Sequence, residues 1–154
     1  MYYEPFVAYI PENHIISQKT EIEISDLILD DILLLQDGHC FRNGILNLCK
    51  NKEVSNKNSF QLQSGSFETL IKLADEGLGT TLLPYLHTLN LNDKDKLKLR
   101  HFKEPKPARE VSLIYPQSEL KIHIIDALRN TIVGVIKGAI AFQNVQIISP
   151  IPKK

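Results

Sequence analysis

The sequence predicts an α/β fold in which helices flank a mostly parallel sheet. Strand-like and helix-like runs alternate along the chain, and this order is typical of parallel sheets covered by helices. The expected order is β-α-β-α-β-α-β followed by β-β-α. The strand runs are 4–10, 31–35, 59–63, 80–83, 97–102 and 110–115, and the helix runs are 26–29, 42–50, 67–76 and a last helix after residue 118.

Capping residues mark the ends of the expected helices. Ser66 is a typical N-cap and Gly77 a typical left-handed C-cap of the third helix. Ser25 is the candidate N-cap of the first helix, and Ser118 opens the last one. That last helix carries apolar residues on one side, namely Ile122, Ile125, Leu128, Ile132 and Ile136. The tail from residue 138 onward is apolar and fits no expected element.

Composition limits the class of protein. The chain has 154 residues, of which 43% are hydrophobic and 23% charged, as expected for one globular domain or part of a larger one. Eighteen basic residues against eighteen acidic ones give no positive surface for nucleic acid, so we expect this chain alone not to bind DNA. No apolar run is long enough to span a bilayer and no secretory signal precedes the first strand, which favours a cytoplasmic protein without membrane contact.

The stretch DGHCFRNGILNLC, residues 37–49, contains both cysteines of the chain. Two cysteines are too few for a disulfide framework, and a reducing compartment keeps ordinary ones as thiols. Free cysteines also pack as small hydrophobic residues, so Cys49, at an apolar helical position, also fits an inert buried residue. The cysteine count alone therefore leaves a structural and a redox role open.

Three blocks together resemble the OxyR branch, the peroxide-sensing group of the LysR-type transcriptional regulators. They are DGHC with a second cysteine nine residues on, SFETLIKLADEGLGTTLLP at 66–84, and Pro107-Ala108-Arg109 leading into a strand. The block 66–84 is shared by LysR-type effector domains in general, whereas DGHC with its second cysteine is more specific. The resemblance covers residues from about 4 to about 129.

The resemblance implies a periplasmic-binding-protein-like effector domain of two α/β lobes joined by crossing strands. Residues 4–107 then form the second lobe, 108–140 the returning strand and helix of the first lobe, and 141–154 a C-terminal tail. The DNA-binding domain, the linker helix and the opening half of the first lobe are expected to lie outside this chain. The fold is thus expected to be partial.

The resemblance also implies a regulator that senses hydrogen peroxide through a reversible Cys40–Cys49 disulfide, not an enzyme and without a cofactor. Cys40 would be oxidised first, and Cys49 would then form the bridge. The whole protein would be a dimer or tetramer, bind DNA through the absent domain, and be reduced by thioredoxin- or glutaredoxin-type partners.

The cysteine spacing supports a conformational switch. A regular helix over 40–49 separates the two Cα atoms by about 13.5 Å and directs the side chains to opposite sides. A disulfide needs Cα atoms roughly 4.4–6.8 Å apart, so the segment must unwind before the bridge can form. Gly44, a poor helix former, lowers the cost of unwinding by roughly 1 kcal/mol relative to alanine.

Several neighbours are candidates for tuning the thiolate of Cys40. His39 and Arg42 are close in sequence, the resemblance brings Arg109 close in space, and positive charge favours a thiolate. Arg42 also fits a solvated helix residue, and His39 a structural histidine. Ser66 and Thr69 are candidates for the ligand cleft, although a cap and a surface residue explain them equally well.

Two other functions stay open. A small-molecule effector domain would bind an organic co-inducer in the interlobe cleft, with the cysteines as bystanders. A zinc site of His39, Cys40 and Cys49 is a poor alternative, because adjacent residues rarely reach one metal ion and the sequence has no Cys-x-x-Cys motif. The fourth ligand would have to be His14, His87, His101 or His123. We therefore expect no metal.

Overall fold

The computed structural model describes residues 1–36, 39–49, 63–118, 120–140 and 144–150. The strands are β1 Tyr2–Tyr9, β2 Glu21–Ile22, β3 Ile32–Leu35, β4 Gln63–Ser64, β5 Thr80–Pro84, β6 Leu99–Phe102, β7 Lys106–Val111 and β8 Val145–Ile147. The α-helices are α1 Cys40–Leu48, α2 Phe67–Asp75, α3 Tyr85–Thr88, α4 Asp93–Lys96 and α5 Ile122–Ala139, and two 3-10 turns span Ile24–Asp26 and Leu29–Asp31.

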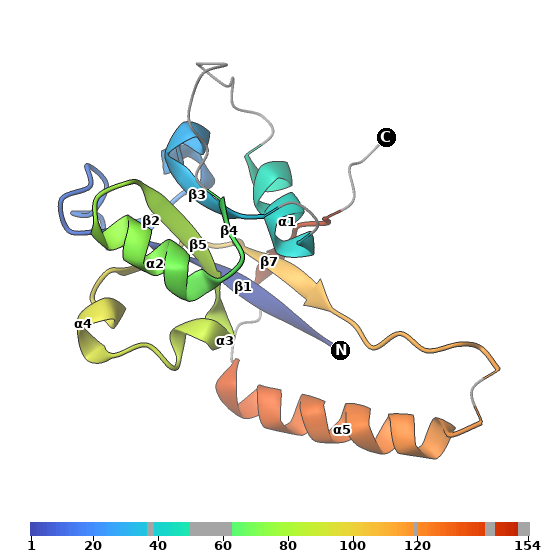
Figure 1. Ribbon diagram of the computed structural model, residues 1–154. Coiled ribbons are helices and arrows are strands. Elements are labelled where there is room, and N and C mark those ends of the chain that lie inside the picture. Colours follow the sequence, from blue (N-terminus) through green and yellow to red (C-terminus); the bar gives the residue numbers. More distant parts are fainter. Residues whose placement is uncertain (37–38, 50–62, 119, 141–143, 151–154) are drawn as a thin grey trace.

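Strand β1 is the centre of the sheet (Figure 1). Its second half pairs antiparallel with β5 and β6, and its first half pairs antiparallel with β7. The β2–β6, β3–β4, β3–β5 and β7–β8 pairs are parallel. Among the described residues the sheet is therefore mixed, with parallel pairing everywhere except along β1. The expected α/β fold is confirmed.

The core lies where β1, β3 and β5 meet α1 and α2. Strands β1 and β3 are almost wholly apolar and buried, as expected for strands covered by helices on a mixed sheet. Helix α2 begins at the N-cap Ser66, whose Oγ accepts a hydrogen bond from the backbone N–H of Thr69. It ends before Gly77, which has φ 79°. Both capping predictions are confirmed.

Two predicted strand positions differ from the structure. The strand expected at 110–115 is displaced: β7 spans Lys106–Val111, so the prediction is right at 110–111 and wrong at 112–115. The prediction missed the start of β7 because Pro105 and Pro107 suggested a turn there. Proline is tolerated at 107 because the pairing of β7 with β1 ends at Ala108, so β1 requires no backbone N–H from residue 107. The strand expected at 59–63 lies almost wholly outside the described residues, and only its last residue falls in β4.

Short elements also differ from the sequence predictions. The helix expected at 26–29 is replaced by the two 3-10 turns, and Glu23 rather than Ser25 caps the first of them. The last helix begins after Lys121 rather than at Ser118. Strands β2 and β8 and helices α3 and α4 were not predicted, because two- to four-residue elements carry too little periodicity.

Helix α5 stands apart from the sheet (Figure 1). None of its residues is buried, and the side chains of Ile124, Leu128 and Val135 are 65%, 49% and 69% exposed. On the predicted apolar side, Ile125, Ile132 and Ile136 are half-buried, and no residue of α5 belongs to the described core cluster. Within the described ranges, no helix combines the length and apolar character needed to cross a membrane.

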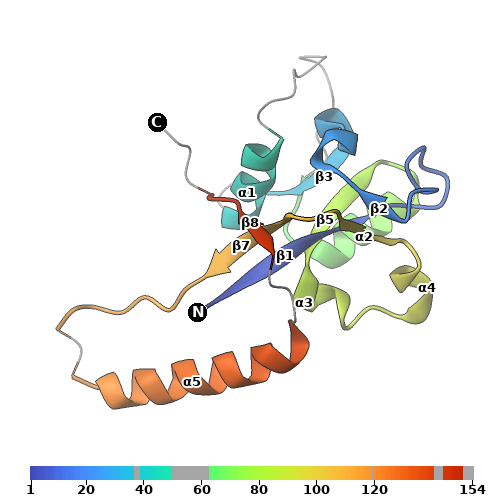
Figure 2. The ribbon, with the colours of Figure 1, turned by 180° about the vertical axis from the view of Figure 1, so that it is seen from behind.

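The C-terminal segment lies beside helix α1 (Figure 2). Strand β8 extends the sheet next to β7, and the backbone N–H of Ile148 donates to the carbonyl of Ala108 at 2.7 Å. The side-chain amide of Asn47 on α1 donates to the carbonyl oxygen of Ser149 at 2.7 Å. Residues 144–150 of the apolar tail, which the sequence left unplaced, thus lie beside the cysteine helix.

Candidate functional site

Helix α1 separates the two cysteines. Cys40 is its first residue and is exposed, whereas Cys49 directly follows its last residue and is 1% exposed. The backbone N–H of Cys49 donates to the carbonyl of Ile45 at 3.1 Å, which continues the helical pattern to the second cysteine. No disulfide joins the two cysteines, and nine residues of a regular helix correspond to a Cα separation of about 13.5 Å. The predicted helix is confirmed and begins at Cys40 itself.

Aromatic contacts hold the first turn of α1 on the core. The ring of Phe41 lies 5.0 Å from that of Phe6 on β1 and 5.2 Å, edge-on, from that of Phe67 on α2. Phe67 in turn lies 5.1 Å from the ring of His87. Such ring pairs contribute roughly 0.5–1.5 kcal/mol each beyond the burial of their area. Phe41, the residue after Cys40, is therefore held against both β1 and α2.

Arg109 lies on β7 and is part of an ion pair. Its Nε and Nη2 donate to Oε2 of Glu4 at 2.9 and 2.7 Å, and its guanidinium lies 5.2 Å from the ring centroid of Phe41. Glu4 is 1% exposed. The structure thus brings Arg109 beside the cysteine helix, as expected, but pairs its charge with a carboxylate. Sequence reasoning missed Glu4, although an acidic residue inside an apolar strand was a signal.

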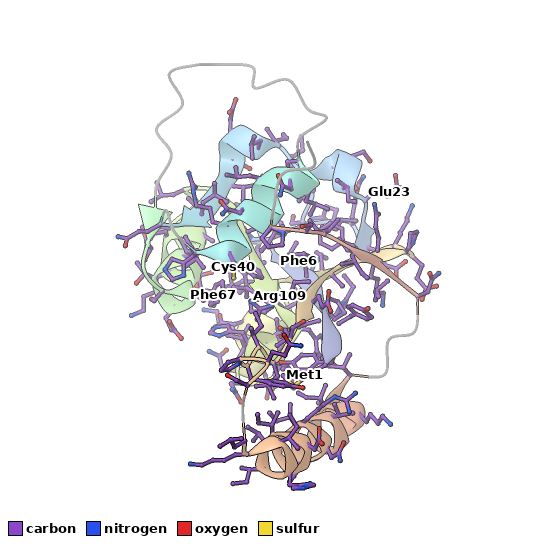
Figure 3. All side chains as sticks on the ribbon, turned by 90° about the vertical axis from the view of Figure 1, so that its right-hand side faces the viewer. Met1, Phe6, Glu23, Cys40, Phe67 and Arg109 are labelled. Atoms are coloured by element: carbon purple, nitrogen blue, oxygen red, sulfur yellow. The ribbon has the colours of Figure 1, made fainter. Side chains whose placement is uncertain are left out.

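A pocket of about 580 Å³ opens at Cys40. Cys40, Phe41 and Gly44 of α1 form one side, Arg109–Ser112 another, and Ile147–Pro150 a third. In Figure 3 the labelled side chains of Cys40, Phe6 and Arg109 gather at this place. An oxidant or a small ligand that enters the pocket therefore meets both Cys40 and Arg109.

The other two candidate tuning residues occupy different environments. His39 is the exposed N-cap of α1, and its backbone carbonyl accepts a hydrogen bond from the N–H of Asn43 at 3.4 Å. Arg42 is only 8% exposed, so the alternative that it is a solvated surface residue is wrong. The effect of either residue on the Cys40 thiol stays a prediction.

Ser66 and Thr69 act together at the start of α2. Besides the capping bond, their hydroxyl oxygens lie 3.1 Å apart. Neither residue is among the described residues that line the Cys40 pocket. The structural role weighed for Ser66, that of a cap, is therefore confirmed, and a role of the pair in a ligand cleft stays a prediction.

The zinc alternative does not fit the geometry. His39 and Cys40 lie at one end of α1 and Cys49 at the other, too far away to share one ion. In the part of the chain that the structure describes, no group of three or more His, Cys, Asp or Glu side chains is arranged to hold a metal ion.

The family of the chain follows from its match to known proteins. Residues 1–136 match the protein family described as the LysR substrate binding domain. The chain belongs to this family. The LysR family is one of transcriptional regulators rather than enzymes, and a relative in Escherichia coli is named a DNA-binding transcriptional dual regulator, OxyR.

Among curated relatives of this LysR domain is a hydrogen peroxide-inducible genes activator of Haemophilus influenzae. It is 30% identical over 119 residues, which cover 77% of this chain and 39% of the relative. A probable hydrogen peroxide-inducible genes activator of Mycobacterium leprae is 31% identical over 115 residues, which cover 75% of this chain and 37% of the relative. This chain therefore spans less than two fifths of the length of either relative.

Solved structures of OxyR share the fold. A mutant OxyR from Porphyromonas gingivalis matches with a TM-score of 0.72 and 26% identity, over 95% of this chain and 67% of that one. Reduced OxyR from the same organism matches with a TM-score of 0.68 and 26% identity, over 94% of this chain and 64% of that one. The expected partial effector-domain fold is thereby confirmed, and its similarity to OxyR with it.

Proposed function

We propose that this chain is the peroxide-sensing part of a LysR-type transcriptional regulator and that it works through a reversible Cys40–Cys49 disulfide. The observation that carries the proposal is the position of the cysteines, at the two ends of one helix, with the first exposed at a pocket. Relatives named hydrogen peroxide-inducible genes activators support it. Residues 37–38 of the DGHC motif lie outside the described residues.

The chemistry needs only the two thiols and peroxide. The Cys40 thiolate attacks one peroxide oxygen, the O–O bond breaks, and the departing hydroxide takes up a proton to leave as water. The sulfur is then a sulfenic acid. The Cys49 sulfur attacks it, the S–O bond breaks and a second water leaves. Two thiols and one peroxide thus give one disulfide and two waters.

The bridge requires a local change of fold. The cysteine Cα atoms must approach from about 13.5 Å to roughly 4.4–6.8 Å, which a helix does not allow. The segment must therefore unwind, and Cys49 must leave its buried position. A change of this size next to strand β7 gives the oxidised state a different surface, which is what a regulator needs.

The remaining roles concern the whole protein and the assignment of its parts. Residues 4–107 form the second lobe, 108–140 return to the first lobe, and 141–154 are the tail. The exposed apolar side of α5 then meets the rest of the first lobe.

The protein acts in the cytoplasm as a dimer or tetramer that binds DNA through a further domain, and thioredoxin- or glutaredoxin-type proteins reduce it by thiol exchange.

Intact-mass measurement tests the proposal. One equivalent of peroxide added to the reduced chain is expected to lower its mass by about two units, and a dithiol is expected to restore it. Cys49→Ser is expected to stop at a sulfenic acid on Cys40, and Cys40→Ser to resist oxidation. Failure of the wild-type chain to form an intramolecular bridge would refute the disulfide switch.

A second function is favoured by one observation, the size of the pocket. A volume of about 580 Å³ lies in the range of sites for small organic ligands and far exceeds the needs of hydrogen peroxide. In this alternative an organic co-inducer binds at Cys40 without redox chemistry. Thermal stabilisation of Cys40→Ser by a metabolite, with no response of wild type to peroxide, would support it.

A further inference from the structure

Glu4 is a buried charge in an apolar strand. Its side chain is 1% exposed, and the residues that follow it in β1 are buried and mostly apolar. A buried carboxylate is costly unless partners use its oxygens, and removing one partner of a buried pair is costly too. The hydrogen-bond partners of the Glu4 carboxylate therefore indicate the role of this buried charge.

Both oxygens of Glu4 are occupied, and each connects a different element. Oε2 accepts two hydrogen bonds from Arg109 on β7, at 2.9 and 2.7 Å, and Oε1 accepts one from the backbone N–H of Leu86 in α3 at 2.9 Å. Glu4 and Arg109 are also directly opposed in the antiparallel β1–β7 pair. The β1–β7 pairing thus places Arg109 opposite Glu4, and the two hydrogen bonds from Glu4 fix the orientation of its guanidinium group.

The guanidinium fixed in this way lies against the cysteine helix. Its central carbon is 5.2 Å from the ring centroid of Phe41, within the range of a cation–π contact. Phe41 directly follows Cys40 in the first turn of α1. In Figure 3 the label of Arg109 lies close to those of Cys40 and Phe6. In this structure, with α1 helical, Phe41 also packs on Phe6 of the core.

We propose that Glu4 is a positioning residue for the redox switch: by holding Arg109 against Phe41, it stabilises the reduced, helical state. The proposal rests on the disulfide proposed above. Because bridging unwinds the segment, Phe41 leaves Arg109 in the oxidised state. A contact made only in the reduced state shifts the oxidation equilibrium towards the thiols, and its loss shifts the equilibrium towards the disulfide.

The test measures the redox equilibrium constant of Cys40–Cys49 in this chain. Protein dithiol is equilibrated with oxidised dithiothreitol, which becomes reduced as the protein disulfide forms, and the fractions are read by mass spectrometry after acid quenching. Glu4→Gln, which keeps the size of the side chain, is expected to raise the constant about two- to tenfold. Phe41→Leu is expected to raise it as well.

The double variant separates the proposed contact from the other effects of each change. If Glu4 acts through Phe41, Glu4→Gln raises the constant clearly less in the Phe41→Leu background than in wild type. Tyr9→Phe is the matched control on β1. It removes the hydroxyl that donates to Asp75 at 2.8 Å and to Asp95 at 3.2 Å, neither of which lies in α1 or β7, and it should leave the constant unchanged.

A purely structural Glu4 gives a different result. Glu4→Gln would then lower the melting temperature while the equilibrium constant stayed within twofold of wild type, and the proposal would be wrong. Arg109→Lys covers the case in which Glu4→Gln fails to fold, since lysine keeps the charge but not the planar group over Phe41. An unchanged constant in that variant overturns the proposal too. Absence of any bridge in wild type would instead refute the proposed function, and this inference with it.

Discussion

Cys40 and Cys49 occupy opposite ends of α1, and only Cys40 is exposed. Cys49 is packed in the core cluster with residues of α1, β1 and β3. This relationship gives the two thiols different access to solvent and prevents them from meeting in the helical state. Most of the expected redox behaviour follows from it.

Cys40 is expected to react with peroxide and with an alkylating reagent more than about tenfold faster than Cys49, because a buried thiol must wait for local opening. Quenched-flow alkylation followed by peptide mass spectrometry measures both rates. Cys40→Ser and Cys49→Ser serve as single-thiol controls. Equal rates would remove the distinction between an attacking and a resolving cysteine.

Gly44→Ala is expected to hold the switch in its reduced form. Alanine is favoured over glycine inside a helix by up to about 1 kcal/mol, and the added Cβ would lie 3.4 Å from Cζ of Phe6, an ordinary contact. The reduced state should become more stable, and the equilibrium constant for oxidation should fall about fivefold. Redox titration and thermal melts measure the two effects.

Gly134→Ala is the matched control for this change. Gly134 lies in α5, and an added Cβ there meets nothing within 4 Å. It should improve the helix propensity of α5 without altering the oxidation equilibrium. A similar fall in the equilibrium constant for oxidation in Gly44→Ala and Gly134→Ala would show that α1 is not the element that unwinds.

Gly79→Ala is expected to destabilise the whole domain. Gly79 has φ 144°, and an added Cβ would collide with the backbone oxygen of Asp31. The combined strain should cost about 2–4 kcal/mol of unfolding free energy in a urea titration. Gly65→Ala is the control, because its nearest neighbour is a side-chain atom of Gln36 at 3.8 Å. Equal stability of the two variants would contradict the described turn before β5.

Tyr9→Phe is expected to lower stability without affecting oxidation. The Tyr9 hydroxyl lies among Asp75, Asp95 and Lys98, and its pKa is raised, first by burial and then by its hydrogen bond to Asp75. Losing a hydroxyl that donates to a charged group costs roughly 1.5–3 kcal/mol. Urea unfolding of the reduced protein measures the loss, and a change below about 0.5 kcal/mol would contradict the role of this network.

The sequence was informative where a residue has one dominant local role. Ser66 and Gly77 marked the ends of α2, because an N-cap and a positive φ each select few residue types. The apolar residues at helical spacing in 42–50 predicted a helix, and the structure contains one at Cys40–Leu48. The family resemblance supplied the effector-domain fold of two lobes joined by crossing strands, which periodicity alone does not give.

Long-range pairing explains what the sequence could not provide. Glu4 and Arg109 are 105 residues apart, and no local pattern links them. Strand β8 exists only through its pairing with β7, so an apolar tail ending in prolines gave no strand signal. The burial of Arg42 likewise depends on elements packed around α1. These features come from tertiary structure, which overrides local propensity.

Amide hydrogen exchange across Phe41–Leu48 tests the central claim most directly. Exchange is measured on the reduced chain and on the chain oxidised with one equivalent of peroxide, after mass spectrometry has shown the intramolecular bridge. Unwinding of α1 predicts strong protection in the reduced state and much faster exchange in the oxidised state, confined mainly to this segment. A bridged protein in which Phe41–Leu48 keeps its protection would contradict the switch, because the disulfide would then form without any change in the helix.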